Sequence, residues 1–165
     1  MHEIEYQDLN DLQIKALTKA AQVLRYAYDP YSGFSVGAAL ATPESKVFCG
    51  VNVANAASGS TICAERGAIL HAYAHGHRKF KYLAIIGQGK DSNTTEVTEP
   101  CGACCQMLHE AQIISGNEII FILSTTKKDK IVLATLKDFF PHGFGPDKLG
   151  VDISKFREER LIPDK

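Results

Sequence analysis

Hydrophobic and polar positions follow a helical period at the start of the chain and an extended pattern after it. Residues 7–27 repeat apolar side chains every three or four positions, which predicts an amphipathic helix that ends before the sequence DPYSG. Residues 34–42 and 46–53 are rich in apolar and β-branched side chains, and the turn sequence PESK separates them. These two segments predict a β-hairpin.

Later segments predict a sheet that is covered by helices. Residues 82–87 and 118–124 are short and almost entirely apolar, as expected for strands buried on both faces. Residues 131–135 predict a fifth strand, and residues 136–140 predict a short helix that ends at Pro141.

Two further helices are expected beside these strands. One runs through residues 63–74 and stops near Gly76, with Ser60 or Thr61 as its N-cap. The other begins at Pro100, because the missing N–H of a proline costs nothing in the first helical turn. The whole pattern predicts an α/β fold with helices on both faces of one sheet.

Composition limits the number of domains and the kinds of partner. The 165 residues are 45% hydrophobic, which suits one core; we assign it to residues 1–150 and treat residues 151–165 as a charged tail of unknown order. The net charge of −1 argues against nucleic acid and anionic lipid as partners. No apolar run has the length of a membrane span and the N-terminus lacks a signal peptide, so we expect a soluble, cytoplasmic protein.

The cysteines favour a metal site over disulfide bonds. There are five of them, and Cys101, Cys104 and Cys105 lie within five residues of one another. Cys101 and Cys104 are one helical turn apart at a helix N-terminus, where the helix dipole favours thiolates, and Cys63 begins another helix. If both helix ends face one point, three thiolates leave a fourth position open, as in a catalytic zinc site.

Glu65 and Arg66 complete this arrangement. Glu65 follows Cys63 by two positions and can approach a site beyond the helix end without binding the metal, so it can serve as a base for a zinc-bound water. Three thiolates weaken zinc as a Lewis acid, and the guanidinium of Arg66 can compensate by donating to the sulfurs.

Each of these residues also has an ordinary interpretation. Cys-x-x-Cys alone fits a redox pair or a structural zinc site with Cys105 as the fourth ligand. Cys63 alone fits a buried apolar position, and Glu65 and Arg66 fit a solvated helix face. The combination favours a catalytic zinc.

The sequences CAE and PCGAC resemble the signature of the cytidine deaminase family. PYSGFSVGAAL, GVNVANA, PCGACCQ and FFPHGFGPDKL also occur in the order and at roughly the spacing of its small homotetrameric members, over about residues 15–150. The cysteine at position 63 favours free nucleosides, because relatives that act on tRNA or DNA generally have histidine there.

The resemblance implies a five-stranded mixed sheet in an α/β/α arrangement and a homotetramer. It implies zinc on Cys63, Cys101 and Cys104, with Glu65 as the proton shuttle. It further implies a substrate pocket in which Phe34 packs near the pyrimidine, the Ala64 backbone meets the base carbonyl and Asn52 holds a ribose hydroxyl, with Phe144 as an aromatic residue contributed to a neighbouring subunit. Taken alone, Phe34 fits a core position and Asn52 a turn.

Departures from the family pattern lie near the expected sugar site. Ala54 replaces a glutamate that normally helps to bind the sugar hydroxyls, and Ser58 replaces a common tyrosine. Cys105 replaces an arginine, which removes a second compensating charge.

The predicted reaction is zinc-dependent hydrolytic deamination of cytidine or deoxycytidine, as in pyrimidine salvage. Two alternatives stay open. One is an aminohydrolase for a modified cytosine nucleoside, blasticidin-like or N4-substituted, and the other is a zinc-stabilised protein without catalysis.

Overall fold

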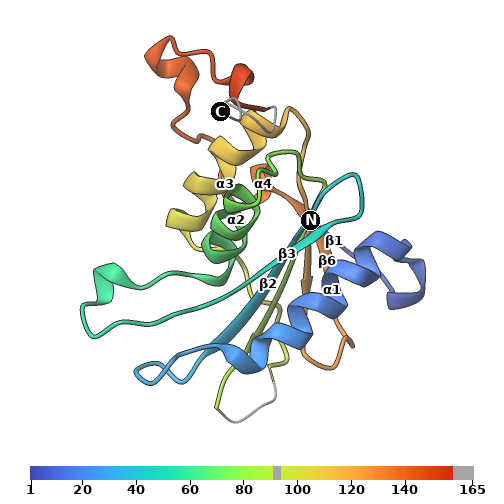
Figure 1. The fold of residues 1–165 in the computed structure, drawn as a ribbon. Coiled ribbons are helices and arrows are strands. Elements are labelled where there is room, and N and C mark those ends of the chain that lie inside the picture. The colour runs from blue at the N-terminus through green and yellow to red at the C-terminus, as the bar shows by residue number, and fades with distance from the viewer. Residues whose placement is uncertain (91–93, 158–165) are drawn as a thin grey trace.

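The computed structural model describes residues 1–90 and 94–157. These residues form one mixed sheet of six strands in the order β1-β6-β5-β4-β2-β3, flanked by helices (Figure 1). The strands are β1 (His2–Glu3), β2 (Ser35–Ala41), β3 (Val47–Val51), β4 (Tyr82–Gln88), β5 (Ile120–Ser124) and β6 (Ile131–Thr135). The α-helices are α1 (Asp11–Val23), α2 (Ala64–Ala74), α3 (Gly102–Ser115) and α4 (Leu136–Phe139).

The sheet confirms the predicted strand pattern. β2 and β3 form the expected antiparallel hairpin, and β2 also pairs antiparallel with β4. The two apolar segments become β4 and β5, which pair in parallel at the centre of the sheet. A parallel pair needs a crossover connection, and α3 supplies it.

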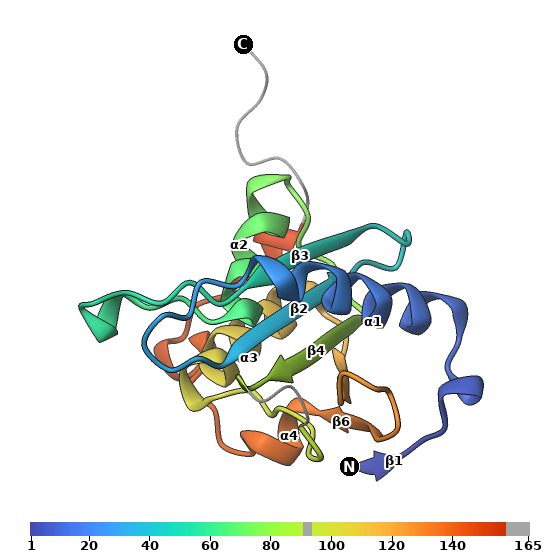
Figure 2. The same ribbon diagram turned by 90° about the horizontal axis from the view of Figure 1, so that it is seen from below.

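Helices cover both faces of the sheet, as the α/β/α prediction requires. On one face α1 packs on the strands, and its buried residues share a core with Ile86 and Ile122. On the other face, α2, α3 and α4 share a second core with Leu83, Phe121 and Leu123. Figure 2 shows α1 and the α2–α3 pair on opposite sides of the strands.

The predicted number of strands was wrong by one. His2 and Glu3 pair with Leu133 and Val132 of β6 and add a sixth strand at the sheet edge. A two-residue strand is too short to show an alternating pattern, so it has no sequence signal.

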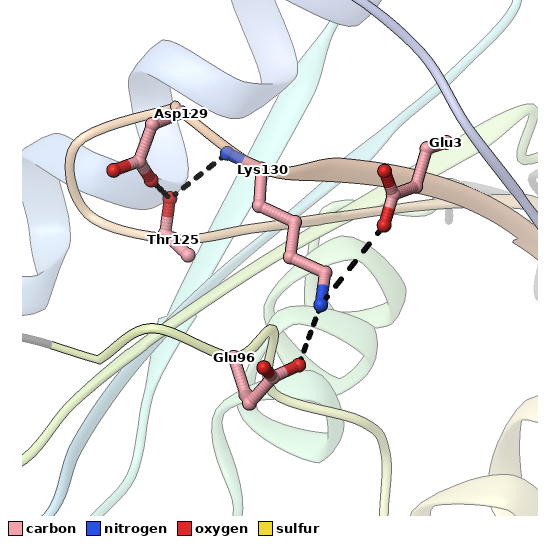
Figure 3. Close-up of polar contacts among 5 residues, drawn as sticks. All are labelled: Glu3, Glu96, Thr125, Asp129 and Lys130. Carbon is pink, nitrogen blue, oxygen red and sulfur yellow. Dashed lines mark hydrogen bonds and ion pairs between the residues drawn. The ribbon is translucent and has the colours of Figure 1, made fainter.

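Polar contacts fix this edge in place (Figure 3). The Lys130 ammonium lies 2.6 Å from the Glu96 carboxylate and 4.0 Å from that of Glu3, so it links β1 to the loop before α3. The Thr125 hydroxyl donates to Asp129 at 2.5 Å and accepts from the Lys130 amide at 3.4 Å, closing the β5–β6 turn. The loop that leads into Cys101 is thus tied to the sheet.

The first helix is shorter than its pattern predicts. The Asn10 side-chain oxygen caps α1 by accepting from the backbone N–H groups of Leu12 and Gln13. In return, the Gln13 side-chain oxygen accepts from the backbone N–H of Asn10. Beyond Val23 the helical pattern continues in a 3-10 turn, η2 (Leu24–Tyr26). The predicted helix therefore corresponds to an α-helix followed by a 3-10 turn.

Two glycines let helices approach the sheet closely. A Cβ at Gly37 would lie 2.3 Å from the carbonyl oxygen of Ala20 in α1. A Cβ at Gly50 would lie 2.2 Å from the carbonyl oxygen of Ala64 and 2.3 Å from the amide of Ala68 in α2. Gly50 thus determines how near the first turn of α2 comes to β3.

The segment after residue 150 lies partly on α3. Ile153 is buried, and a 3-10 turn, η5 (Ser154–Arg157), follows it. The Arg157 Nε donates to the carbonyl oxygen of Ile114 at 2.8 Å. The domain boundary at residue 150 remains a prediction, because the rest of the expected tail, residues 158–165, lies outside the described residues.

Candidate metal centre and active site

Two helices on the same face of the sheet each begin at a cysteine. Cys63 is the N-cap of α2 and Cys101 is the N-cap of α3; both are extended, and neither sulfur caps its own helix. The predicted caps Ser60 and Thr61 were wrong, because the pairing of Val53 with Ile62 keeps the chain extended up to residue 62. Pro100 likewise lies before the N-cap of α3 instead of in its first turn.

The three predicted metal ligands meet at these helix ends. The Sγ atoms of Cys63, Cys101 and Cys104 all lie within 4.8 Å of one another. Cys63 Sγ is 3.9 Å from Cys101 Sγ, which is 3.5 Å from Cys104 Sγ. A tetrahedral zinc with Zn–S bonds of about 2.3 Å needs sulfurs about 3.8 Å apart, so these residues fit zinc.

The surroundings favour negative charge at Cys63 and disfavour it at Cys104. Hydrogen bonding from Cys104 lowers the pKa of the Cys63 thiol to about 5, and Cys101 and Arg66 also lower it. The pKa of Cys104 is raised, because its thiol donates to Cys63 and is buried. Zinc binds cysteine as thiolate, so the lowered pKa of Cys63 favours metal binding there, and Cys104 would give up its proton to the same ion.

Glu65 is buried beside the cluster. It lies in the first turn of α2 and only 4% of its side chain is exposed, although most glutamates lie in water. Burial raises its carboxyl pKa, and the negative charge of Cys63 raises it further. A carboxyl group held closer to neutrality in this way is suited to both accepting and donating a proton.

Arg66 links the cluster to the segment before α2. Its Nη2 donates to the Thr61 carbonyl oxygen at 2.6 Å and to Cys63 Sγ at 3.9 Å. The guanidinium therefore lies where the sequence analysis expects a compensating charge, and the Thr61 carbonyl orients it. Thr61 was expected to cap α2 with its side chain; instead its backbone carbonyl holds the Arg66 guanidinium in place.

Cys105 does not join the cluster. Its side chain is buried, its Sγ donates to the carbonyl oxygen of Pro100 at 3.7 Å, and burial raises the pKa of its thiol to about 11. Cys105 is not among the three cysteines whose sulfurs lie within 4.8 Å of one another. The alternative of a structural zinc with Cys105 as fourth ligand has no support in this geometry.

Phe34 and Asn52 lie together where β2 begins. The Asn52 side chain accepts from the Val36 amide at 2.7 Å and donates to the Phe34 carbonyl oxygen at 2.9 Å. This pair of bonds gives Asn52 a structural role between the end of β3 and the start of β2, and it leaves one amide hydrogen for a ligand. The Phe34 ring is 36% exposed, so it is not a core residue.

A feature that the sequence analysis did not identify lies beside Phe34. Phe34 and the loop at residues 94–98 line a cavity of about 380 Å³. A Cβ at Gly87 would lie 2.0 Å from the Thr98 hydroxyl and 2.8 Å from the Phe34 ring, so both side chains meet over this glycine. The loop is polar and without periodicity, and the only sequence signal for it is the glycine that ends the apolar run.

The other residues expected in or near the pocket belong to three different segments of the chain. Ala64 is fully buried at the start of α2, and Ala54 lies at the base of the exposed segment 55–60. Ser58 is within that segment, in a 3-10 turn. Phe144 is 58% exposed, and its carbonyl oxygen accepts from Gln106 of α3 at 2.7 Å.

Comparison with known proteins identifies the family. The model of the cytidine and deoxycytidylate deaminase zinc-binding region matches residues 11–120. The chain belongs to this family. Its resemblance to the family is therefore confirmed, and with it the prediction of zinc as the metal.

Several relatives extend the match to most of the chain. A cytidine deaminase from Sporosarcina psychrophila is 33% identical over 135 residues, covering 82% of this chain and 93% of the relative. A probable cytidine deaminase from Dictyostelium discoideum is 45% identical over 92 residues, covering 56% of this chain and 60% of the relative. The crystal structure of cytidine deaminase from Burkholderia pseudomallei has a TM-score of 0.71 at 34% identity, covering 82% of this chain and 100% of that one.

Proposed function

We propose that this chain deaminates a cytosine nucleoside by zinc-dependent hydrolysis, converting cytidine or deoxycytidine to uridine or deoxyuridine and releasing ammonia. The observation that carries this proposal is the buried Glu65 beside three cysteine sulfurs at two helix N-termini. Three ligands leave a coordination position open for chemistry, whereas a structural zinc site is closed by a fourth.

Glu65 moves the protons of this reaction. Bound zinc supplies a Lewis acid that makes water nucleophilic near neutral pH. Glu65 would take a proton from the water as its oxygen bonds to C4, and would pass that proton to N3 of the base. It would then move the proton of the new C4 hydroxyl to the amino nitrogen, so that the C4–N bond breaks, neutral ammonia leaves and a carbonyl remains at C4. The raised carboxyl pKa of Glu65 supports this role, because it lies nearer to the working pH than that of an exposed glutamate.

The remaining side chains position the substrate. Phe34 packs against the pyrimidine, and the Ala64 backbone binds the base carbonyl at the start of α2. The free amide hydrogen of Asn52 donates to a ribose hydroxyl. Arg66 withdraws charge from the sulfur of Cys63, to which it already donates.

A homotetramer completes the site. Segment 55–60 is exposed throughout, and Phe144 is an exposed apolar side chain. Contact with a neighbouring subunit would bury both. We infer that Phe144 contributes to the pocket of that neighbour.

None of the helices in residues 1–90 and 94–157 has the length and apolarity to cross a bilayer. We propose a cytoplasmic enzyme of pyrimidine salvage that uses neither nucleic acid nor membrane.

Ala54 favours a second candidate substrate class. An alanine at this position offers no side-chain hydrogen bond to a sugar hydroxyl, so cytosine nucleosides with an altered sugar, such as blasticidin-like compounds, are the alternative substrates. N4-substituted cytidines belong to the same alternative class of modified cytosine nucleosides.

The test is release of the C4 amine from a panel of compounds by the zinc-loaded protein: ammonia for all of them except N4-methylcytidine, which would release methylamine. The panel contains cytosine, cytidine, deoxycytidine, a blasticidin-like nucleoside and N4-methylcytidine. Turnover of cytidine and deoxycytidine supports the first proposal, and turnover of only the modified compounds supports the second. No release from any of them would favour the non-catalytic zinc protein.

A further inference from the structure

A second group of metal-binding side chains lies at the other end of α2. His71 and His75 are one helical turn apart, and both are exposed. Their ring centroids are 4.9 Å apart. They follow Cys63 by eight and twelve positions, roughly 12–18 Å along the helix axis, so they are separate from the cysteine cluster.

The hydrogen bonds of these two histidines leave the same ring nitrogen available on each. Nδ1 of His71 lies 2.9 Å from the carbonyl oxygen of Cys49, and Nδ1 of His75 lies 2.9 Å from the carbonyl oxygen of His71. A carbonyl oxygen only accepts, so each Nδ1 carries the hydrogen and each Nε2 has a free lone pair. Histidine ligands of metals generally donate their other ring N–H in this way.

Packing on Phe48 also restrains the two rings. The Phe48 ring is buried, with its centroid 5.4 Å from that of His71 and 5.7 Å from that of His75. Both side chains therefore lose part of their rotamer freedom before any metal binds. His77 also contacts Phe48, but its Nε2 lies 3.1 Å from the Lys46 ammonium, so we do not count it as a ligand.

We propose that Nε2 of His71 and Nε2 of His75 form a second, surface metal site for a divalent transition metal of the zinc, nickel and copper group. Two histidines at positions i and i+4 of a helix can bind one such ion, and imidazole suits these metals over magnesium or calcium. Water fills the other coordination positions. Bound metal fastens the last turn of α2 to β3, because the Nδ1 of one ligand is bonded to Cys49.

The test is a calorimetric titration of zinc-loaded protein with Ni²⁺, with released zinc measured in parallel. One Ni²⁺ should bind per chain without loss of zinc. His71→Asn and His75→Asn should each weaken Ni²⁺ binding at least about tenfold. Loss of a residue that only supports a metal ligand already lowers metal affinity by about this factor, so loss of a ligand should lower it at least as much. Asparagine can keep the hydrogen bond to the carbonyl oxygen and removes Nε2, so the fold, checked by circular dichroism, should persist.

Two histidines elsewhere supply the controls. His142→Asn should leave Ni²⁺ binding unchanged, and so should His2→Asn, which removes the imidazole next to the N-terminal amine. As a second readout, Ni²⁺ should broaden the imidazole proton signals of His71 and His75 before those of His142. Binding that is lost in His2→Asn, unchanged in His71→Asn, or accompanied by one equivalent of released zinc would overturn the proposal.

Discussion

At the scale of single residues, Cys101 and Cys105 have opposite roles although both lie in one short motif. Cys101 belongs to the three-sulfur cluster, whereas the Cys105 thiol is buried and its pKa is raised to about 11. We expect Cys101→Ala to lose most of the zinc and Cys105→Ala to keep about one zinc per chain, because two thiolates hold zinc less well than three. Elemental analysis of the two purified variants measures this, and full zinc in Cys101→Ala would refute the ligand assignment.

Ala54 sets the expected tolerance for sugars. A glutamate there would add charge-assisted hydrogen bonds to ribose hydroxyls, each worth roughly 1.5–3 kcal/mol. We expect the wild type to process cytidine and deoxycytidine with similar efficiency, and Ala54→Glu to raise kcat/KM for cytidine more than for nucleosides with altered sugars. Parallel kinetics on both proteins decide this. A strong preference of the wild type for one sugar, combined with damage from the glutamate, would show that another residue completes the pocket.

At the scale of elements, the close approach of β3 and α2 determines where Glu65 and Cys63 lie. A methyl group at Gly50 would overlap backbone atoms of Ala64 and Ala68. We expect Gly50→Ala to destabilise the fold by about 1–3 kcal/mol, as overpacked cores do, and to weaken zinc binding by displacing the start of α2. Urea unfolding and zinc titration measure the two effects.

Gly59 provides the matched control for that variant. A Cβ at Gly59 would have no heavy atom within 4 Å. Gly59→Ala should therefore leave both stability and zinc affinity close to those of the wild type. If Gly50→Ala behaved in the same way, close packing against β3 would not be what positions the site.

An element could be predicted from the sequence when its own residues define it, and could not when residues distant in the chain define it. Strands β4 and β5 could be predicted because their own residues are apolar throughout. The start of α2 could not, because the pairing of Val53 with Ile62 determines it and Thr61 offered a plausible cap by its own chemistry. Strand β1 depends on contacts with β6 and Lys130, which are more than a hundred residues away.

At the scale of the whole molecule, the cysteine spacing predicted the metal ligands because each motif lies within one helical turn. The spacing did not reveal that Glu65 is buried or that Phe34 lies against residues 94–98, because both depend on packing between elements. The second core, formed by the three helices on one face, is what brings two cysteine motifs 38 positions apart in the chain to one point.

Zinc should therefore stabilise the whole fold, since it joins the starts of α2 and α3. A ligand present at about a thousand times its dissociation constant stabilises a protein by about 4 kcal/mol, which corresponds to a Tm change of roughly 8–16 °C at this size. We expect a chelator to lower the Tm by an amount of this order and added zinc to restore it. Differential scanning calorimetry measures this, and an unchanged Tm after verified loss of zinc would contradict it.

The central claim is that Glu65 moves protons beside a zinc held by three cysteines, and Glu65→Gln tests it most directly. The measurement is the rate of ammonia release from cytidine, with zinc content and circular dichroism determined on the same samples. We predict that the variant keeps about one zinc per chain and the native fold, and that its turnover falls at least about 10²-fold to 10⁴-fold. A folded, zinc-loaded Glu65→Gln protein with turnover close to that of the wild type would contradict the mechanism.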